Sequence, residues 1–401
     1  MAVARQRKGQ PTFLSLFSGC GGLDLPFHAL GYKCIGAYDS NPIAVETYNA
    51  NFGRFAQQFD LSTAYPTVSE FPDILLAGPP CQGFSTAGAR KPDDPRNLLI
   101  GRTIDFAQKI KPRVIVLENV PAILSGPSRD HWVRAAARLK RSGYTVRSEL
   151  LSGIDLGLCQ TRKRLFMLAW NSSSEHLALN SIQAVSPPTL GQVLARLSGT
   201  ENHQPKVLPP TSLQGMIARR VGAGQRLCDV RESTSTIHSW DIPEIFGRTS
   251  LIERKVLMAV LRLRRRARVR DFGDGDPVSV ARIEQFVGSR CQSLVNSLAA
   301  KRYLRVSNGA VEFQRTFNGK YRRAKKDGVS STVDTHFGDP SLFLHPVEHR
   351  GFTVREGARI QSFPDSFIFG GSTRMQFRLV GNAVPPVMAQ QIASWTKHLL
   401  S

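Results

Sequence analysis

The chain has 401 residues, of which 41% are hydrophobic and 21% charged, so it can bury the core of one large domain and a smaller one. It carries 53 Lys and Arg against 31 Asp and Glu, and its net charge of +22 is typical of a protein that binds a polyanion such as nucleic acid. The six cysteines form no C-x-x-C pair, which argues against a disulfide scaffold or metal site, and no apolar run reaches membrane-spanning length. We therefore expect a cytoplasmic protein without a membrane partner.

The first part of the chain, from Phe13 to about Asn171, alternates short apolar runs with segments compatible with helices. The predicted strands are Thr12–Leu16, Cys34–Tyr38, Ile74–Ala77, Val114–Glu118 and Leu165–Ala169. The predicted helices are Leu23–Leu30, Pro42–Asn51, Leu98–Lys109 and His131–Ser142. This alternation indicates an open, mostly parallel α/β sheet. Ligands of such sheets bind beyond the carboxyl ends of the strands, so the residues that follow each strand are candidates for a site.

A glycine-rich turn, Phe17 to Gly22, follows the first strand and leads into a helix. Its glycines let the backbone approach a ligand closely, which indicates a nucleotide-like cofactor only weakly when taken alone. Asp39, at the end of the second strand, suits the hydroxyls of a ribose. Asp60 lies at a further strand end and could accept a hydrogen bond from an adenine amine, although a solvated loop carboxylate is the simpler interpretation.

A Pro-Pro-Cys-Gln motif at 79–82 follows the third strand, whose end is marked by Gly78. The prolines fix the backbone, so the Cys81 thiol is held on a rigid turn at a strand's carboxyl end, where it could act as a nucleophile. A cysteine in a Pro-Cys pair is, on its own, more often a small buried hydrophobic residue.

Charged residues mark the next two strands. Glu118 closes the apolar run 114–117, where partial burial would raise the pKa of its carboxyl and let it hold or donate a proton. A structural glutamate at a helix start is an equally good interpretation in isolation. Arg162 and Arg164 alternate along an extended segment, so both could direct charge toward an anion or toward Glu118.

The pattern changes near Ser172, where serines and prolines indicate a linker or irregular region. Residues 248–327 hold 20 Lys and Arg against 7 Asp and Glu, a net +13. Within them we expect helices over 251–270, 278–288 and from a Ser289 N-cap to Arg302, then a hairpin across Asn308-Gly309. This order is that of a winged helix with 289–302 as recognition helix; a helical insert that merely packs is the alternative.

Two further segments lie near the C-terminus. Residues 355–365 predict a helix that stops before Pro364, and residues 381–386 form a glycine-led turn into a helix. In chain order the sequence thus shows FLSLFSGCGG, GPPCQGFS, ENV, QTRKRLF, REGARIQSFPD and GNAVPP.

These six ordered motifs resemble those of the DNA (cytosine-5) methyltransferases of bacterial or phage type across nearly the whole chain. The resemblance implies an α/β fold, a Rossmann-like S-adenosylmethionine-dependent methyltransferase sheet with a smaller, largely helical target recognition domain. It divides the chain into a catalytic domain (1–185), a target recognition region (186–350) that contains the basic segment, and C-terminal motifs that return to the catalytic domain (351–401).

The resemblance also implies the catalytic roles. Cys81 would add to C6 of a cytosine flipped out of duplex DNA, and Glu118 would contact N3 and the exocyclic amine of that base. Arg162 and Arg164 would orient the base and support the charge near Glu118 and Cys81. Residues at the substrate would include Gln82, Ser85, Asn119 and Gln160. The S-adenosylmethionine pocket would be lined by Phe17, Gly19, Gly21, Asp39, Ser40, Asp60, Leu61, Gly78, Pro80, Asn382 and Val384.

The implied partner is double-stranded DNA, with a cognate restriction endonuclease as a further candidate, and we expect a monomer. Ser40 stands where many members of the family place a larger side chain against the adenine, which puts stacking there in doubt. Two alternatives stay open: methylation of cytosine in tRNA, and a DNA-binding protein that keeps the fold only as a scaffold. The intact Cys81, Glu118, Arg162 and Arg164 argue against the scaffold.

Overall fold

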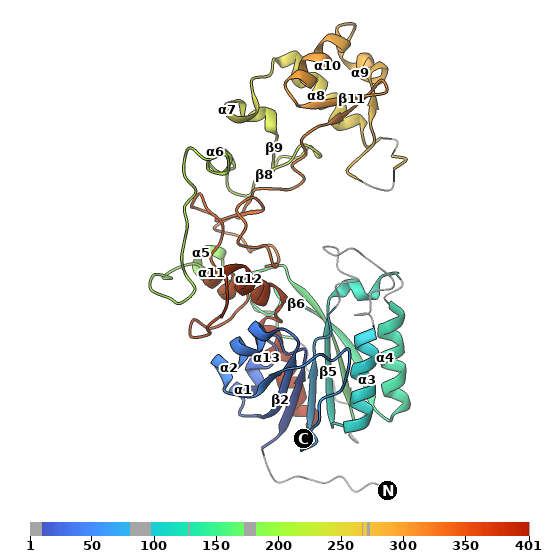
Figure 1. The fold of residues 1–401 in the computed structure, drawn as a ribbon, viewed down its shortest axis with the longest axis vertical. Coiled ribbons are helices and arrows are strands. Elements are labelled where there is room, and N and C mark those ends of the chain that lie inside the picture. The colour runs from blue at the N-terminus through green and yellow to red at the C-terminus, as the bar shows by residue number, and fades with distance from the viewer. Residues whose placement is uncertain are drawn as a thin grey trace. The chain divides into compact units, whose positions relative to one another are not determined.

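A seven-stranded sheet forms the centre of the first part of the chain. The computed structural model describes residues 10–80, 98–126, 129–171, 182–266, 268–270 and 273–400. The sheet order is β3-β2-β1-β4-β5-β7-β6. Its strands are β1 (Thr12–Leu16), β2 (Lys33–Asp39), β3 (Ala56–Gln58), β4 (Ile74–Ala77), β5 (Val114–Asn119), β6 (Thr145–Ser152) and β7 (Lys163–Trp170). Strands β1 to β5 pair in parallel, whereas β7 runs antiparallel to β5 and β6 (Figure 1).

All five predicted strands are present, and the bounds of β1 and β4 match to the residue. The sheet also contains two strands that the sequence pattern does not indicate, β3 and β6. Strand β3 is only three residues long and reads Ala-Gln-Gln. Strand β6 is an edge strand whose Arg147 and Glu149 interrupt the apolar run. An edge strand buries less of its surface, so its composition carries a weaker signal.

Helices cover both faces of this sheet, and successive residues of its strands face opposite sides. Phe13 packs on the face covered by α1 and α13, whereas Leu14 packs on the face covered by α3 and α4. Figure 1 shows these two groups of helices on either side of the strands. The helices are α1 (Leu25–Ala29), α2 (Pro42–Phe52), α3 (Leu99–Ile110), α4 (Arg129–Arg141) and α13 (Pro386–Leu400), with a 3-10 turn at Pro121–Leu124. The four predicted helices of this part are thereby confirmed.

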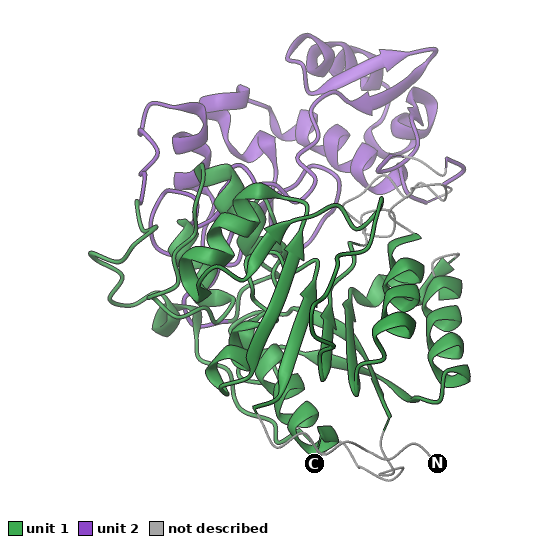
Figure 2. Ribbon diagram, turned by 60° about the horizontal axis from the view of Figure 1, so that its bottom comes forward, with its two compact units in different colours: residues 1–204, 329–336, 353–401 green, residues 205–328, 337–352 purple. Residues whose placement is uncertain are grey.

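The chain forms two compact units, drawn in different colours in Figure 2. The first contains residues 1–204, 329–336 and 353–401, and the second contains residues 205–328 and 337–352. Residues 186–204 therefore lie with the first unit, although the resemblance places them in the recognition region. Contacts distant in the sequence explain this: Arg359 of the C-terminal segment donates to the carbonyls of Val193 and Ala195, and buried Leu190 begins helix α5 (Leu190–Val193).

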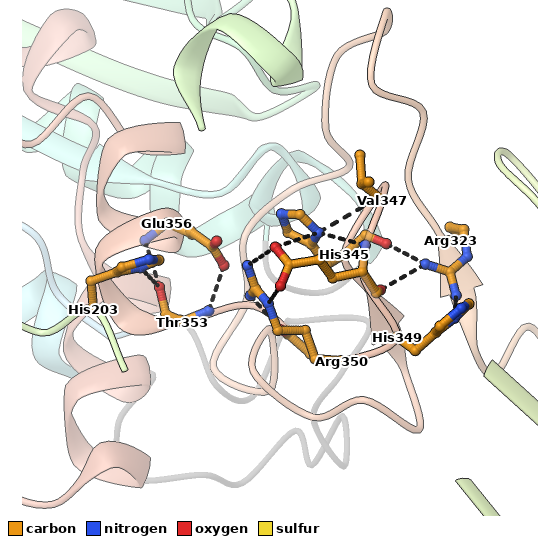
Figure 3. Close-up of polar contacts among 10 residues, drawn as sticks. His203, Arg323, His345, Val347, His349, Arg350, Thr353 and Glu356 are labelled. Carbon is orange, nitrogen blue, oxygen red and sulfur yellow. Dashed lines mark hydrogen bonds and ion pairs between the residues drawn. The ribbon is translucent and has the colours of Figure 1, made fainter. Parts of the chain in front are cut away.

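The C-terminal part of the first unit begins with α11 (Val354–Ile360), which ends before Pro364 as predicted, and continues with α12 (Thr373–Asn382). A capping box fixes the start of α11: the Glu356 amide donates to Thr353 Oγ1, and the Thr353 amide donates to Glu356 Oε2. His203 Nδ1 lies 2.9 Å from the same hydroxyl oxygen (Figure 3). Thus α11 is held to the chain segment that precedes the second unit.

Within the second unit, a buried arginine joins three chain segments. Arg323 Nε donates to the Val221 carbonyl, and Nη1 donates to the His345 and Glu348 carbonyls. His349 Nδ1 lies 3.1 Å from Arg323 Nη2 (Figure 3). The smaller elements of this unit are α6 (Leu213–Arg220), β8 (Arg226–Leu227), β9 (Thr236–Ile237), the 3-10 turn Ser239–Asp241, α7 (Pro243–Phe246), β13 (Arg322–Arg323) and β14 (Phe343–Leu344).

The basic segment of the second unit folds as a helix, a short strand, two helices and a hairpin. In chain order these are α8 (Leu251–Leu263), β10 (Val278–Ser279), α9 (Val280–Val287), α10 (Cys291–Ala300), β11 (Leu304–Ser307) and β12 (Ala310–Phe313). The strands pair in the order β10-β12-β11, all antiparallel. This is the order of elements expected for a winged helix.

Three details of the basic segment differ from the expectation. The first helix ends at Leu263, because the residues that follow turn back on Asp276, whose carboxylate accepts from the amides of Val269 and Arg270. Residues 278 and 279 pair as a strand with β12 before α9 begins. Ser289 does not cap α10: its N-cap is Arg290, without a side-chain hydrogen bond, and the helix ends at Ala300.

Candidate active site

The glycine turn after β1 has the backbone conformation that its composition predicts. Phe17 and Gly19 both have φ of 55°, and Gly21 has φ of 91°. A Cβ added to Gly21 would overlap the Phe52 ring, whereas one added to Gly19 would meet no atom of the described residues within 4 Å. The turn is therefore closed toward α2 at Gly21 and open at Gly19, where a ligand could approach the backbone.

Asp39 lies at the carboxyl end of β2 and faces this turn. Its Oδ2 accepts from the Gly19 amide at 2.9 Å, and its Oδ1 accepts from the Asn41 amide at 2.8 Å. Burial raises the pKa of the Asp39 carboxyl, while the hydrogen bonds from Asn41 and Gly19 and the charge of Arg378 oppose that rise. A carboxylate has about four acceptor positions, so two N–H bonds leave capacity for hydroxyl groups such as those of a ribose.

The residues expected near an adenine differ in their burial. Asp60 is exposed, and hydrogen bonds from Ser62 lower the pKa of its carboxyl. Ser40 is also exposed. Leu61 is buried, and its carbonyl accepts from Arg102 Nε at 2.7 Å. Asp60 and Ser40 are therefore accessible to a ligand, while Leu61 is anchored to α3 through Arg102.

Glu118 lies at the carboxyl end of β5 and forms an ion pair with Arg164 of β7. The Arg164 Nε to Glu118 Oε1 distance is 2.8 Å, and both side chains are only 12% exposed. Burial raises the pKa of the Glu118 carboxyl, against the charges of Arg164 and Arg162, which lower it. A Cβ added to Gly78 would lie 3.5 Å from Glu118 Oε2, so the carboxylate stands beside the backbone that leads into the Pro-Pro-Cys motif.

Asn119, the last residue of β5, also holds the start of that motif. Its Nδ2 donates to the Pro79 carbonyl at 3.3 Å, and its Oδ1 accepts from the Val120 amide. Parallel pairing of Ala77 with Leu117 sets the ends of β4 and β5 at one edge of the sheet. Pro80 is half-buried at this edge. The next residues of the expected site, Cys81, Gln82 and Ser85, lie outside the described residues.

Arg162 takes a different position from Arg164. It is 1% exposed, and its guanidinium donates to the carbonyls of Val333, Gly381 and Ala383, each at 2.9 Å. Gln160, expected at the substrate, is fully buried: it bonds to the Ile360 carbonyl, the Gln361 side chain and the Val333 amide. Both side chains thus fix the C-terminal segments against the segment before β7.

The turn between α12 and α13 follows Asn382 and contains Val384. A Cβ added to Gly22 would overlap the Val384 carbonyl oxygen, so this turn packs directly on the glycine turn. Asn382 ends α12 and is exposed. Arg378, four residues earlier on the same helix, acts electrostatically on Asp39 and was not among the predicted residues. Its i, i+4 spacing from Asn382 was the available signal.

The described residues contain no group of three or more His, Cys, Asp or Glu side chains that could hold a metal ion. They also contain no helix long and apolar enough to cross a membrane.

Comparisons with known proteins place this arrangement in a family. A model of the C-5 cytosine-specific DNA methylases matches residues 11–398. The type II methyltransferase M.DdeI of Desulfomicrobium norvegicum is 31% identical over 95% of this chain and 88% of its own length, and M.AgeI of Thalassovita gelatinovora is 28% identical over 97% and 99%.

Solved structures share the fold. A protein described as a DNA modification methyltransferase encoded within an E. coli prophage has a TM-score of 0.58 at 23% identity, covering 98% of this chain and 99% of that one. The S. pombe Dnmt2 methyltransferase has a TM-score of 0.52 at 18% identity, covering 97% and 99%. With the family match extending over nearly the whole chain, this protein belongs to the C-5 cytosine-specific DNA methylases and is a DNA (cytosine-5) methyltransferase.

Proposed function

We propose that this enzyme methylates C5 of a cytosine flipped out of duplex DNA, with S-adenosylmethionine as methyl donor and Cys81 as nucleophile. The observation that carries the proposal is the buried Glu118–Arg164 pair beside Gly78. It places a carboxyl group with a raised pKa next to the backbone from which Cys81 follows three residues later.

The chemistry explains why these residue types are needed together. C5 of cytosine is a poor nucleophile, and addition of the Cys81 thiolate to C6 makes C5 enamine-like, so that it can accept a methyl group. Loss of the C5 proton then expels the thiolate and restores the aromatic base. The atom attacked is out of reach in a stacked duplex, so the nucleotide must leave the stack at a cost of a few kcal/mol.

Glu118 and Arg164 would assist the addition step. A protonated or hydrogen-bonded N3 favours attack at C6, and the raised pKa of the Glu118 carboxyl suits a group that donates to N3. Arg164, at 2.8 Å, orients that carboxyl. The charge of Arg162 lowers the pKa of the Glu118 carboxyl, but its guanidinium donates hydrogen bonds to three backbone carbonyls. We therefore assign Arg162 a positioning role.

The glycine turn and the strand ends fit the cofactor. Asp39 has acceptor capacity for ribose hydroxyls, and the open side of Gly19 admits a ligand close to the backbone. Asp60 and Ser40 are exposed at neighbouring strand ends, the Val384 backbone packs on the glycine turn at Gly22, and Asn382 is exposed two residues earlier. S-adenosylmethionine, when bound, supplies the methyl group as an electrophilic substituent of its sulfonium.

The partners follow from the family and the charge. Duplex DNA is the proposed substrate, and the net charge of +22 supports a polyanionic partner. Several relatives are named type II methyltransferases, which supports a cognate restriction endonuclease as a further partner. We propose a monomer that acts in the cytoplasm. The second candidate substrate is tRNA, because the covalent chemistry at cytosine would be the same.

Trapping with 5-fluorocytosine tests the mechanism. Fluorine at C5 cannot leave as a proton does, so wild-type protein with S-adenosylmethionine should form a stable covalent complex with a fluorinated duplex pool. Cys81→Ser should form none and should lose methyl transfer, while its non-covalent binding to duplex DNA persists. A normal rate in Cys81→Ser would exclude the proposed nucleophile. Methyl incorporation into tRNA but not into duplex DNA would transfer the proposal to tRNA, and no adduct with either would favour the scaffold.

A further inference from the structure

The basic segment of the second unit contains a helix-turn-helix, α9 and α10. The connection is Gly288-Ser289-Arg290, and Gly288 has φ of 89°, which lets the chain leave α9 sharply. Both helices pack with α8 and the three-stranded sheet on one core, to which α10 contributes Cys291, Val295 and Leu298. In such motifs the second helix is the one that enters the major groove of DNA.

The opposite side of α10 is polar and exposed. Gln292, Ser293 and Asn296 all lie on this side, within about one helical turn of one another. No arginine lies within α10 itself; Arg290 and Arg302 flank it and are both exposed. This distribution places uncharged hydrogen-bonding side chains on the exposed side of the helix and cations beyond its two ends.

The two amides on α10 are held side by side. Gln292 Nε2 donates to Asn296 Oδ1 at 3.0 Å. This bond leaves an amide oxygen on Gln292 and an amide hydrogen on Asn296 that it does not use. Adenine offers one donor, N6–H, and one acceptor, N7, in the major groove, so an amide oxygen and an amide N–H are its natural complement.

The surroundings of α10 suit a phosphate backbone. Residues 278–315 contain six Lys and Arg against two Asp and Glu. The hairpin β11–β12 forms the wing, with Asn308 and Gly309 both at positive φ, as a tight type I′ turn requires. Glu312, one of the two acidic residues, is already engaged by Arg270 and Arg305. The module therefore combines a polar reading face with cationic flanks.

We infer that α10 is the helix that reads bases in the target duplex, with Gln292 and Asn296 on the edge of an A·T pair and Ser293 beside them. Arg290 and Arg302 contact the flanking phosphates. This inference rests on the proposed action on duplex DNA and deepens it by naming residues that decide which cytosines are reached. It also fixes one property of the recognised site, which includes at least one A·T pair.

A binding selection tests this inference without methyl transfer. Full-length wild type and the variants Gln292→Ala, Asn296→Ala and the double variant are each used to select duplexes from a random pool, which are then sequenced. Wild type should enrich a motif that contains an A·T pair. The variants should lose ~5- to 150-fold of the discrimination at that pair, as expected for one bidentate base contact, while retaining discrimination elsewhere. Gln390→Ala, an exposed amide on α13, is the matched control and should select the wild-type motif.

The outcomes separate this inference from the proposed chemistry. Identical base preferences in the wild type and in any correctly folded α10 variant would overturn it, as would a wild-type motif without an A·T pair. Covalent trapping of Cys81 is an independent readout, so an unchanged motif together with a normal adduct would reject α10 as the reader and leave the methylation mechanism intact. A changed motif in the α10 variants, together with no covalent adduct in the wild type, would support α10 as the reader and reject the methylation mechanism.

Discussion

Two arginines separated by one residue have different tasks in this enzyme. The extended pattern predicts that Arg162 and Arg164 face the same way, but β7 begins at Lys163, so the strict alternation of a strand does not include Arg162. Arg164 pairs with Glu118, whereas Arg162 bonds to carbonyls of the C-terminal segments. The motif therefore couples Glu118 to the C-terminal segments of the first unit.

Asp24, two residues after the glycine turn, is another buried ionisable residue that the sequence does not single out. It is fully buried and accepts from Ser15 Oγ and Tyr48 OH, each at 2.9 Å. Burial raises the pKa of its carboxyl from 3.8 to about 7. Below 3.8 the group is protonated in both states; between 3.8 and about 7 it is protonated only in the folded state. This group therefore makes the folded protein less stable as pH rises through that interval.

Replacing Asp24 with Asn should remove this pH dependence. The free energy of unfolding of Asp24→Asn, relative to wild type, should rise between pH 4 and pH 7 by up to about 4 kcal/mol, since each pKa unit is worth about 1.36 kcal/mol. Urea denaturation at several pH values measures the difference. A difference that stays constant over this interval for Asp24→Asn would mean that its pKa is not raised.

Individual site residues were predictable where they follow a buried strand. Asp39 and Glu118 could be placed because apolar runs reveal parallel strands, and such strands end at a common edge. Arg378 and Asp24 could not be placed in the same way. Their roles depend on which segments pack beside them, and residues distant in the sequence supply those contacts, as Tyr48 does for Asp24.

At the scale of elements, strong local sequence signals were sufficient to predict a helix, strand or turn, and weak signals were not. The Asn308-Gly309 turn predicted the wing, and the T-x-x-E pattern at Thr353 accompanies a capping box. Strand β6 was missed because it is a polar edge strand. Ser289 looked like a helix cap, yet Gly288 and the burial of Cys291 set the start of α10. Packing thus overrides capping preference where the two disagree.

The glycine turn contains a position, Gly21, whose geometry disfavours any side chain. Gly21→Ala combines positive φ with overlap of the new Cβ and the Phe52 ring, so it should destabilise the protein by about 2 kcal/mol or more. Gly101→Ala is the control: it lies in α3, and its Cβ would meet no described atom within 4 Å. That change should be neutral or stabilise by up to about 1 kcal/mol. Thermal unfolding of both variants measures the contrast, and equal transition temperatures would contradict this reading of the turn.

At the scale of the whole molecule, the order of motifs anticipated a chain that leaves the sheet domain and returns to it. The return is visible in the first unit, which takes in 329–336 and 353–401. Its boundaries could not be read from composition, because Arg359 and Gln160 reach across about 165 to 200 residues of sequence to make their bonds. The distribution of charge, in contrast, could be determined directly from the sequence, since the basic excess is concentrated in residues 248–327.

This concentration of charge leads to a prediction for DNA binding by the full chain. Each phosphate contact releases condensed counterions, so the logarithm of the binding constant should fall with the logarithm of salt concentration by about 0.9 per contact. Removing Arg290 and Arg302 together should lower that slope by about 1.8 on any duplex sequence, because phosphates carry no base identity. Fluorescence anisotropy at several salt concentrations measures the slope. Arg134→Ala, an exposed arginine of α4 in the first unit, should change it less than the double variant does. A slope unaltered by the double variant would show that the cations flanking α10 do not contact the backbone, even if α10 itself proved to read bases.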